Sequence, residues 1–597
     1  MEKIRTWLGG NAARLLWRLV LGYAAASSAL FLTGETEPQI LSLCVFLGMF
    51  FLMDTPRGAV NAGTRAVSAV LALVYALCAL VANYAWLSKA YGFFSLYSVK
   101  MLALLWLAFY GLLTALYPRC LSTRMRREGA AKLTSAQAFF IAFLGLLAVY
   151  TWCFLCHFPG NVMADTRTQL AQIVGLDPYS NHHPMAHTLL MKVFFDLGYA
   201  LFHTQNAGVA CVTVSQYVAV AAAFAFLLAT MQKKGVRAAL IVCSFLFFAF
   251  APNNLLFSVT LTKDVPFAIA TLLLFTLLWR RMGEEKKAAR IVETVLLGVS
   301  ALGVCTLRTN GVYAFLVLLP LMLLCLPKRK WLSVYPALLC GLALALVFRG
   351  PVLRGMGVTP PDAIESLSVP AQQIARAVSD GYAPNAEEAA LLDAVVDTAR
   401  IADTYDPHTS DPIKELVREK GAQQALSENK GAYLRLWLSI GRKNLKSYLF
   451  GWVDETVGFW YPNIEYTSLY LGGIHRESTR LDISTEPVLT GEPAALLNAW
   501  LTGARIVPVL GLVYTIGTAT WAGLFLLGLA VLKKARWQVL PSLFWLLVFG
   551  TLMLATPVHA EFRYLYAVFV LLPLLTILPY TGGDGELLAN TESVKGR

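Results

Sequence analysis

A polar segment that follows the long apolar run 135–156 holds the first side chains that could do chemistry. It contains Asp165 and Gln169, and the histidines His182 and His183 come shortly after them. Ionisable groups at the end of a membrane helix are costly unless they bind a ligand or take part in a reaction. Because a carboxylate can deprotonate a hydroxyl group, Asp165 is the candidate general base.

Three later segments carry cations that could bind an anionic group, and they contribute Lys263, Arg308 and Arg563. Arginine can hold a phosphate through two parallel hydrogen bonds, and lysine adds a compact charge. A base together with three cations fits the transfer of a sugar from a polyprenyl phosphate, because the cations stabilise the charge that grows on the departing phosphate. The polar neighbours of these cations, which extend the candidate substrate pocket, are Asp264, Asn310, Glu561 and Tyr564.

The composition indicates which elements position these residues. The chain has 597 residues, of which 57% are hydrophobic and 14% are charged, whereas soluble domains carry about 25% charged residues. The apolar runs, read against a need for about 20 residues per membrane helix, predict an all-α polytopic membrane protein with about fourteen spans. These lie near residues 14–33, 38–54, 66–88, 98–117, 135–156, 208–231, 237–252, 265–280, 291–307, 311–326, 331–348, 507–532, 537–556 and 563–580.

The net charge of +13 indicates membrane topology rather than nucleic-acid binding, because the basic residues recur in every second loop. Cytoplasmic loops are enriched in lysine and arginine, so we expect these loops in the cytoplasm, in contact with anionic lipids. The alternation holds only if the segment 186–207 does not cross the membrane, and we interpret it as an interfacial helix. All the candidate site residues then lie on the outer side.

This topology predicts the organisation of the chain. A long polar stretch outside the membrane contains an amphipathic basic segment at 431–450 that is typical of a helix on the membrane surface. The predicted parts are accessory transmembrane helices at 1–134, a transmembrane module at 135–348 with its outer loop at 157–207, an extracytoplasmic and mainly helical domain at 349–506, C-terminal transmembrane helices at 507–580 and a cytoplasmic tail at 581–597.

The histidines leave a metal site open as an alternative. His183 and His187 are four residues apart and would share one face of a helix, a spacing that can hold a divalent cation. Pro184 favours the first turn of a helix, which makes His183 a residue of the helix cap rather than half of a metal-binding pair. No cofactor is certain from the sequence.

Several motifs together resemble a known group of proteins. They are Phe158-Pro159-Gly160 with Asp165 and Gln169, Asn181-His182-His183-Pro184, Lys263-Asp264, Arg308 with Asn310-Gly311, and Glu561 with Arg563-Tyr564. Through these motifs the chain resembles an uncharacterised family of bacterial multi-span proteins related to the GT-C glycosyltransferases. That superfamily includes protein O-mannosyltransferases and the lipid A aminoarabinose transferase. The resemblance covers roughly residues 135–350 well, and the final helices loosely.

The resemblance implies a GT-C-like helix bundle in the bacterial cytoplasmic membrane and an inverting glycosyltransferase activity. It implies that Asp165 is catalytic, that His182 and His183 line the donor or acceptor pocket, and that a monophosphate donor needs no metal. Two departures weaken any assignment to a subfamily. Four spans precede the module, and Thr166 follows Asp165 where the superfamily often has an acidic pair.

The expected function is therefore transfer of a sugar from a polyprenyl-phosphate-linked donor to a cell-envelope glycan, lipid or protein. Two rival functions stay open. An O-antigen polymerase or ligase would also use outer-face arginine and histidine, with its key residues in one long late loop such as 349–506. A transporter or flippase of lipid-linked sugars would have matched broken helices in two halves, and the sequence shows no such symmetry.

Overall fold

The computed structural model describes residues 2–34, 40–53, 60–129, 133–283, 287–462, 464, 474, 480–506 and 511–588. Regular structure in these residues is almost entirely helical, and the named strands are β1 (Asn161–Val162) and β2 (Thr260–Leu261). The chain is therefore an all-α protein, as its apolar runs predict. Most of the predicted tail at 581–597 lies outside the described residues.

Among the described residues, ten helical segments are long and apolar enough to cross a membrane. Such helices satisfy their own backbone hydrogen bonds, which lipid cannot do. The ten are Ala12–Thr33, Ala62–Ala82, Leu96–Ser122, Ser135–Cys156, Met185–Phe202, Gln205–Lys233, Asp264–Met282, Lys328–Gly355, Trp537–Ala555 and Phe562–Tyr580.

Further apolar helices accompany these ten. The helices α10 (Ala238–Phe250) and α11 (Pro252–Val259) form one apolar pair that is bent by 53°. Three shorter apolar helices are α2 (Ile40–Leu52), α14 (Thr309–Cys325) and α25 (Ile516–Leu532). These lengths fit a multi-pass membrane protein, whereas the number of fourteen spans and the interfacial placement of 186–207 stay predictions.

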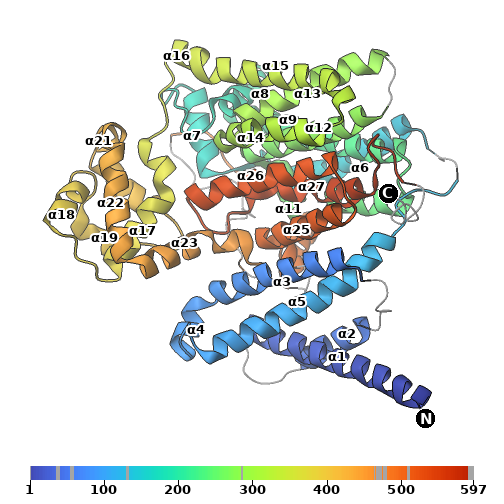
Figure 1. Cartoon of the computed structure of the whole chain (residues 1–597). Coiled ribbons are helices and arrows are strands. Elements are labelled where there is room, and N and C mark those ends of the chain that lie inside the picture. The colour runs from blue at the N-terminus through green and yellow to red at the C-terminus, as the bar shows by residue number, and fades with distance from the viewer. Residues whose placement is uncertain are drawn as a thin grey trace. The chain divides into compact units, whose positions relative to one another are not determined.

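The chain divides into two compact units, of which the first comprises the described residues of 1–124 together with 524–535. Its N-terminal helices are α1 (Glu2–Thr33), α2, α3 (Ala62–Ala82), α4 (Tyr84–Ala90) and α5 (Leu96–Ser122). Helix α5 packs against both α1 and α3. Figure 1 shows α3 and α5 side by side in blue. The small residues Ala24, Ala25 and Ala108 contribute to the core of this unit, where they allow close packing of helices.

The second unit, residues 125–523 and 536–588, contains a helix bundle and a separate group of shorter helices. Within the bundle, α12 (Asp264–Met282) packs against α9 (Gln205–Lys233), α13 (Lys287–Thr306) and α27 (Tyr566–Ile577). It is among the most deeply buried of the apolar helices. The bundle helices are α6 (Ser135–Cys156), α8 (Met185–Phe202), α9 (Gln205–Lys233), α12 (Asp264–Met282), α13 (Lys287–Thr306), α14, α15 (Trp331–Val347), α26 (Leu540–Ala555) and α27 (Tyr566–Ile577).

The group of shorter helices follows the bundle helix α15 and has an apolar core of its own. It appears in yellow and orange in Figure 1 as the cluster of α17 to α22. Its helices are η4 (Ala363–Leu367), α17 (Ser368–Ser379), α18 (Ala386–Asp393), α19 (Thr398–Thr404), α20 (Asp411–Glu419), α21 (Gln423–Glu428) and α22 (Lys430–Lys443). We call this group the helical domain.

The amphipathic segment predicted at 431–450 is not one continuous helix. It divides at Asn444 into α22 and α23 (Leu445–Trp460). Helix α22 packs its buried Leu436 and Ile440 into the core of the helical domain. The apolar face of this helix is therefore used in part for packing within the protein.

Candidate functional site

The candidate site is assembled by a very short parallel sheet. Strand β1 pairs with β2 in the register Asn161 to Thr260 and Val162 to Leu261. The Gln216 side chain donates from Nε2 to the carbonyl oxygen of Thr260 at 2.9 Å, which holds β2 against α9. Because Asp165 comes three residues after β1 and Lys263 two residues after β2, the pairing brings these two residues together.

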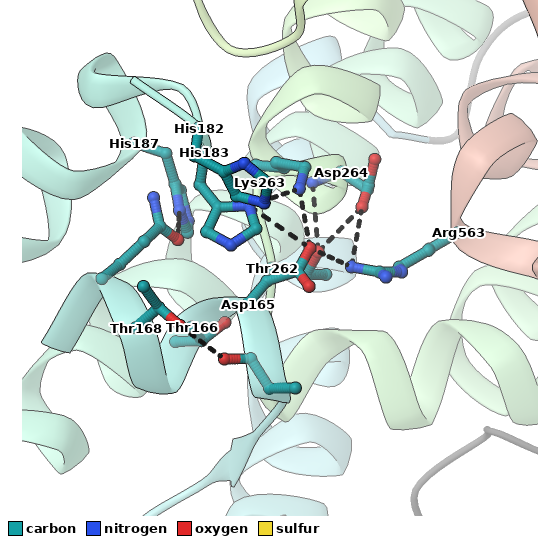
Figure 2. A network of polar contacts seen from close by, with 12 residues as sticks. Asp165, Thr166, Thr168, His182, His183, His187, Thr262, Lys263, Asp264 and Arg563 are labelled. Carbon is teal, nitrogen blue, oxygen red and sulfur yellow. Dashed lines mark hydrogen bonds and ion pairs between the residues drawn. The ribbon is translucent and has the colours of Figure 1, made fainter. Parts of the chain in front are cut away.

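Two cations converge on the Asp165 carboxylate. The Lys263 Nζ and an Arg563 guanidinium nitrogen each donate to Asp165 Oδ2 at 2.7 Å, as Figure 2 shows. The Asp165 side chain is 23% exposed, that of Lys263 15% and that of Arg563 9%. Asp165 also lies in the first turn of α7 (Ala164–Ile173), where the helix dipole favours a negative charge. The site therefore combines a partly accessible carboxylate with two nearly buried cations.

These neighbours set the protonation states of the site. Burial alone would raise the pKa of Asp165, but Arg563 and Lys263 hold it well below its usual range. Burial and the Lys263 charge lower the pKa of His183 well below its usual value. The Nδ1 of this neutral histidine lies 3.3 Å from Lys263 Nζ. Because an ammonium can only donate, Nδ1 accepts and the proton of the ring is on Nε2.

A second ion pair lies directly beside the first. The Arg308 guanidinium donates to Asp264 Oδ1 at 2.5 Å and to the carbonyl oxygen of Tyr564 at 2.9 Å. Thr262 donates its hydroxyl to the other oxygen of Asp264 at 2.8 Å. Arg308 thus fixes the start of α12 to the segment that carries Arg563.

Arg563 lies among three carboxylates. Besides Asp165, it approaches Asp264 Oδ2 at 3.9 Å and Glu561 Oε2 at 3.5 Å. Its guanidinium carbon lies 5.3 Å from the centre of the Tyr564 ring, and that of Arg308 lies at the same distance. Acidic and basic side chains are thus closely matched in this cluster, so an anionic ligand would compete with the carboxylates for the cations.

The structure brings together most of the residues predicted for the site. Some of them, however, form hydrogen bonds with other side chains of the protein. Gln169 is buried, donates to Thr188 and accepts from His187 Nδ1 at 2.9 Å, so it supports the histidine. Asn310 donates to the hydroxyl of Thr551 at 3.1 Å. Arg308, which is predicted to bind a phosphate, pairs with Asp264, and its role toward a phosphate stays a prediction.

The predicted alternative of a metal between His183 and His187 stays a prediction: His183 Nδ1 lies 3.3 Å from Lys263 Nζ, and His187 Nδ1 donates to Gln169. Among the residues described, one group of three or more His, Cys, Asp or Glu side chains has ligand atoms within 4.8 Å of one another, namely His182, Asp362 and Glu365. Arg418 donates to both of these carboxylates, so the arrangement is better explained as an ion-pair network.

Sequence reasoning did not single out two threonines that shape the site. Thr166 donates to the carbonyl oxygen of Leu261 at 2.5 Å and fixes the start of α7 to β2. Thr262 orients Asp264. Thr166 directly follows Asp165, and Thr262 lies two residues before Asp264. This closeness in sequence to the acidic residues is the signal that the sequence contains.

Comparisons with known proteins give one match. No curated protein and no solved structure matches the chain. Residues 177–582 match a family described as a family of unknown function, DUF6020. This region includes Lys263, Arg308 and Arg563, and it begins after Asp165. Because the match covers more than half of the sequence, the chain belongs to the family of unknown function DUF6020.

Proposed function

We propose that this protein is a membrane glycosyltransferase that moves a sugar from a polyprenyl-phosphate donor to an extracytoplasmic acceptor, with Asp165 as the general base. One observation carries the proposal: Lys263 and Arg563 both lie 2.7 Å from the same oxygen of Asp165. A carboxylate for a hydroxyl proton and two cations for a phosphate are the groups that this reaction needs.

The contacts suggest how donor binding would activate the base. A donor phosphate competes with Asp165 for Lys263 and Arg563, and arginine is well suited to bind phosphate. As the two cations turn to the phosphate, the pKa of Asp165 rises toward its usual value, because those cations are what lower it. Asp165 then becomes a stronger base when the donor is in place.

The proposed chemical step is a single displacement. The acceptor hydroxyl oxygen forms a bond to the anomeric carbon, and its proton passes to Asp165. The bond between the anomeric carbon and the phosphate oxygen breaks, and its electron pair stays on the polyprenyl phosphate. Lys263 and Arg563 stabilise this charge, while Arg308 positions the segment that carries Arg563. Attack from one face and departure from the other invert the anomeric configuration.

The ends of α12 support a site on the outer side of the membrane. Asp264 is the first residue of this helix, and Arg280 and Arg281 lie in its last turn. At 1.5 Å per residue, the helix separates the two ends by about 28 Å, close to the thickness of the bilayer core. Because basic helix ends favour the cytoplasm, the end with Asp264 is assigned to the opposite side.

The test uses purified full-length protein and radiolabelled polyprenyl-phosphate sugars, with wild type compared with Asp165→Asn. Asp196→Asn is the matched control, because Asp196 is exposed and pairs with Lys192 on α8. We expect wild type and the control to release the sugar, and Asp165→Asn to be slower by about a hundredfold or more. Equal rates for wild type and Asp165→Asn would remove Asp165 as the base.

A second candidate is a carrier that moves lipid-linked sugars across the membrane. The 53° bend between α10 and α11 favours it, because carriers contain broken spanning helices. The same assay separates the two functions, since a carrier leaves the donor intact, whereas the enzyme separates the labelled sugar from its lipid.

A further inference from the structure

The helical domain contains a cavity of about 890 Å³. Core residues of the domain form much of its wall, among them Val396, Ile413 and Leu436, and Ile374 and Trp437 continue the apolar surface. Protein cores contain few voids larger than a water molecule, whereas ligand pockets are mainly apolar and occupy roughly 300–1,000 Å³. The volume and lining of this cavity are those of a ligand pocket.

One polar atom in the wall indicates the chemistry of the ligand. Gln423 lines the cavity, and its Oε1 accepts the Ile364 N–H at 3.3 Å. Its Nε2 is buried and donates to no residue in the described part of the chain. A buried donor without an acceptor is unfavourable, so a ligand that presents an oxygen acceptor here would satisfy it. An ester or amide carbonyl on an aliphatic chain combines such an oxygen with an apolar body, whereas a polyprenyl chain has no carbonyl.

One end of the cavity adjoins the candidate site. Thr359 pairs with the loop of the site, because its N–H donates to the Tyr179 carbonyl and its carbonyl accepts from Asn181 N–H. The next three residues, ending in Asp362, line the cavity. Gln423 bonds to the backbone of Ile364, so the unsatisfied donor lies near this same end.

The remaining gap to Asp165 is short. Asp362 and His182 have ligand atoms within 4.8 Å of each other. The rings of His182 and His183 are 4.6 Å apart between centres, and His183 Nδ1 lies 3.7 Å from Asp165 Oδ2. Figure 2 shows the two histidines next to each other, close to Lys263 and Asp165.

We infer that this cavity binds an acyl chain of an amphipathic ligand, with the acyl carbonyl accepting a hydrogen bond from Gln423 Nε2 and the polar end directed toward His182. The binding of an acyl chain is independent of the proposed enzymatic function. The further step, that the acylated ligand is the sugar acceptor, rests on the proposed function.

The test places full-length protein in nanodiscs of ether-linked diphytanyl phosphatidylcholine, whose chains carry no ester carbonyl. The probes are a monododecanoyl glycerol with a diazirine in its chain and the corresponding dodecyl glycerol ether. After irradiation, cross-linked peptides are identified by mass spectrometry, and unlabelled compounds provide apparent affinities by competition. We expect the ester probe to label peptides of α17 and α22, and wild type to prefer ester over ether by about tenfold.

Two variants make the test specific. Ile374→Trp fills the cavity and should reduce labelling at least tenfold, whereas Leu438→Trp, on the exposed face of α22, should leave it unchanged. Gln423→Glu keeps the oxygen that accepts from Ile364 and removes the donor, so it should abolish the preference for the ester. Labelling confined to the membrane helices, or equal affinity of wild type for both probes, would overturn the acyl site.

Asp165→Asn separates this inference from the enzymatic proposal. It should retain acyl labelling and lose sugar transfer. Labelling of the helical domain by a wild type that transfers no sugar would overturn the enzymatic function and leave the acyl site standing. Sugar transfer by wild type without labelling of this domain would overturn the acyl site alone.

Discussion

The Lys263 ammonium lies 2.7 Å from Asp165 Oδ2, although 98 residues separate the two in the chain. Arg563 reaches the same oxygen at the same distance. Because both cations bond to this one oxygen, an incoming phosphate would compete with Asp165 for both of them. The contacts of Asp165 with these two cations therefore lower the pH at which its carboxylate takes up a proton.

Replacing Lys263 by methionine should reduce the amount of thermal stability that the protein loses at acid pH. The folded-state pKa of Asp165 lies well below its unfolded value of about 3.9. The stabilisation is therefore present above the unfolded pKa and is lost as the pH falls through the folded pKa. Without Lys263 the folded pKa rises toward the unfolded one, so we expect Lys263→Met to lose less thermal stability than wild type as the pH falls.

The measurement is the unfolding temperature of both proteins between pH 3 and pH 7. Lys192→Met is the matched control, because Lys192 forms an exposed pair with Asp196 on one helix face, and such pairs contribute little. The control should follow the wild-type curve. If the unfolding temperatures of wild type and Lys263→Met fall equally as the pH is lowered, the assigned role of Lys263 is wrong.

Replacing Arg308 by lysine should weaken the site although the charge is kept. One guanidinium nitrogen of Arg308 bonds both to Asp264 and to the Tyr564 carbonyl. A lysine ammonium is a compact charge on a flexible stem and lacks the planar guanidinium, whose carbon lies 5.3 Å from the centre of the Tyr564 ring. We expect Arg308→Lys to lose about 2 kcal/mol of stability, measured as a lower unfolding temperature, and exposed Arg435→Lys to lose none. An unchanged unfolding temperature would show that Arg308 is not needed to hold this segment.

The sequence predicts much of the architecture and part of the site. The apolar runs predict the helices because lipid-facing helices have a strong compositional signal. The predicted topology puts Asp165, Lys263 and Arg563 in separate loops on one side of the membrane. The pairing of Arg308 with Asp264 could not be predicted, since it depends on how α12 and α14 pack. The register of β1 and β2 likewise involves two residues in each strand and has no periodicity. The cavity in the helical domain arises from tertiary packing alone.

Cysteine labelling should place the candidate site on the outer side of the membrane. Thr168 is exposed one turn after Asp165, and Arg329 is exposed in η2 (Lys328–Lys330), in a predicted cytoplasmic loop. The native cysteines, three of which are exposed, are first replaced by serine. An impermeant maleimide should label Thr168→Cys in intact cells, and Arg329→Cys only after the membrane is opened. The reverse pattern would invert the topology and with it the extracytoplasmic site.

Replacing Glu455 by glutamine should stabilise the protein at alkaline pH. Glu455 in α23 is fully buried, and burial raises the pKa of its carboxyl well above the usual value, although Gln372, Ser410 and Lys414 act in the opposite direction. The folded-state pKa therefore lies above the unfolded value of about 4.3. The stabilisation is complete below the unfolded pKa and is lost as the pH rises through the folded pKa, by at most about 1.4 kcal/mol for each pH unit.

Glutamine has the shape of the protonated carboxyl and does not titrate, so Glu455→Gln and wild type should unfold at similar temperatures near pH 5. At pH 8 the variant should unfold at the higher temperature. Glu415→Gln is the control, because Glu415 is exposed and pairs with Arg418 three residues away on the same helix, and its removal should not produce this difference. If wild type instead gains stability over Glu455→Gln as the pH rises, then the carboxylate is the form that the folded protein prefers, and Lys414 outweighs burial as the dominant influence on its pKa.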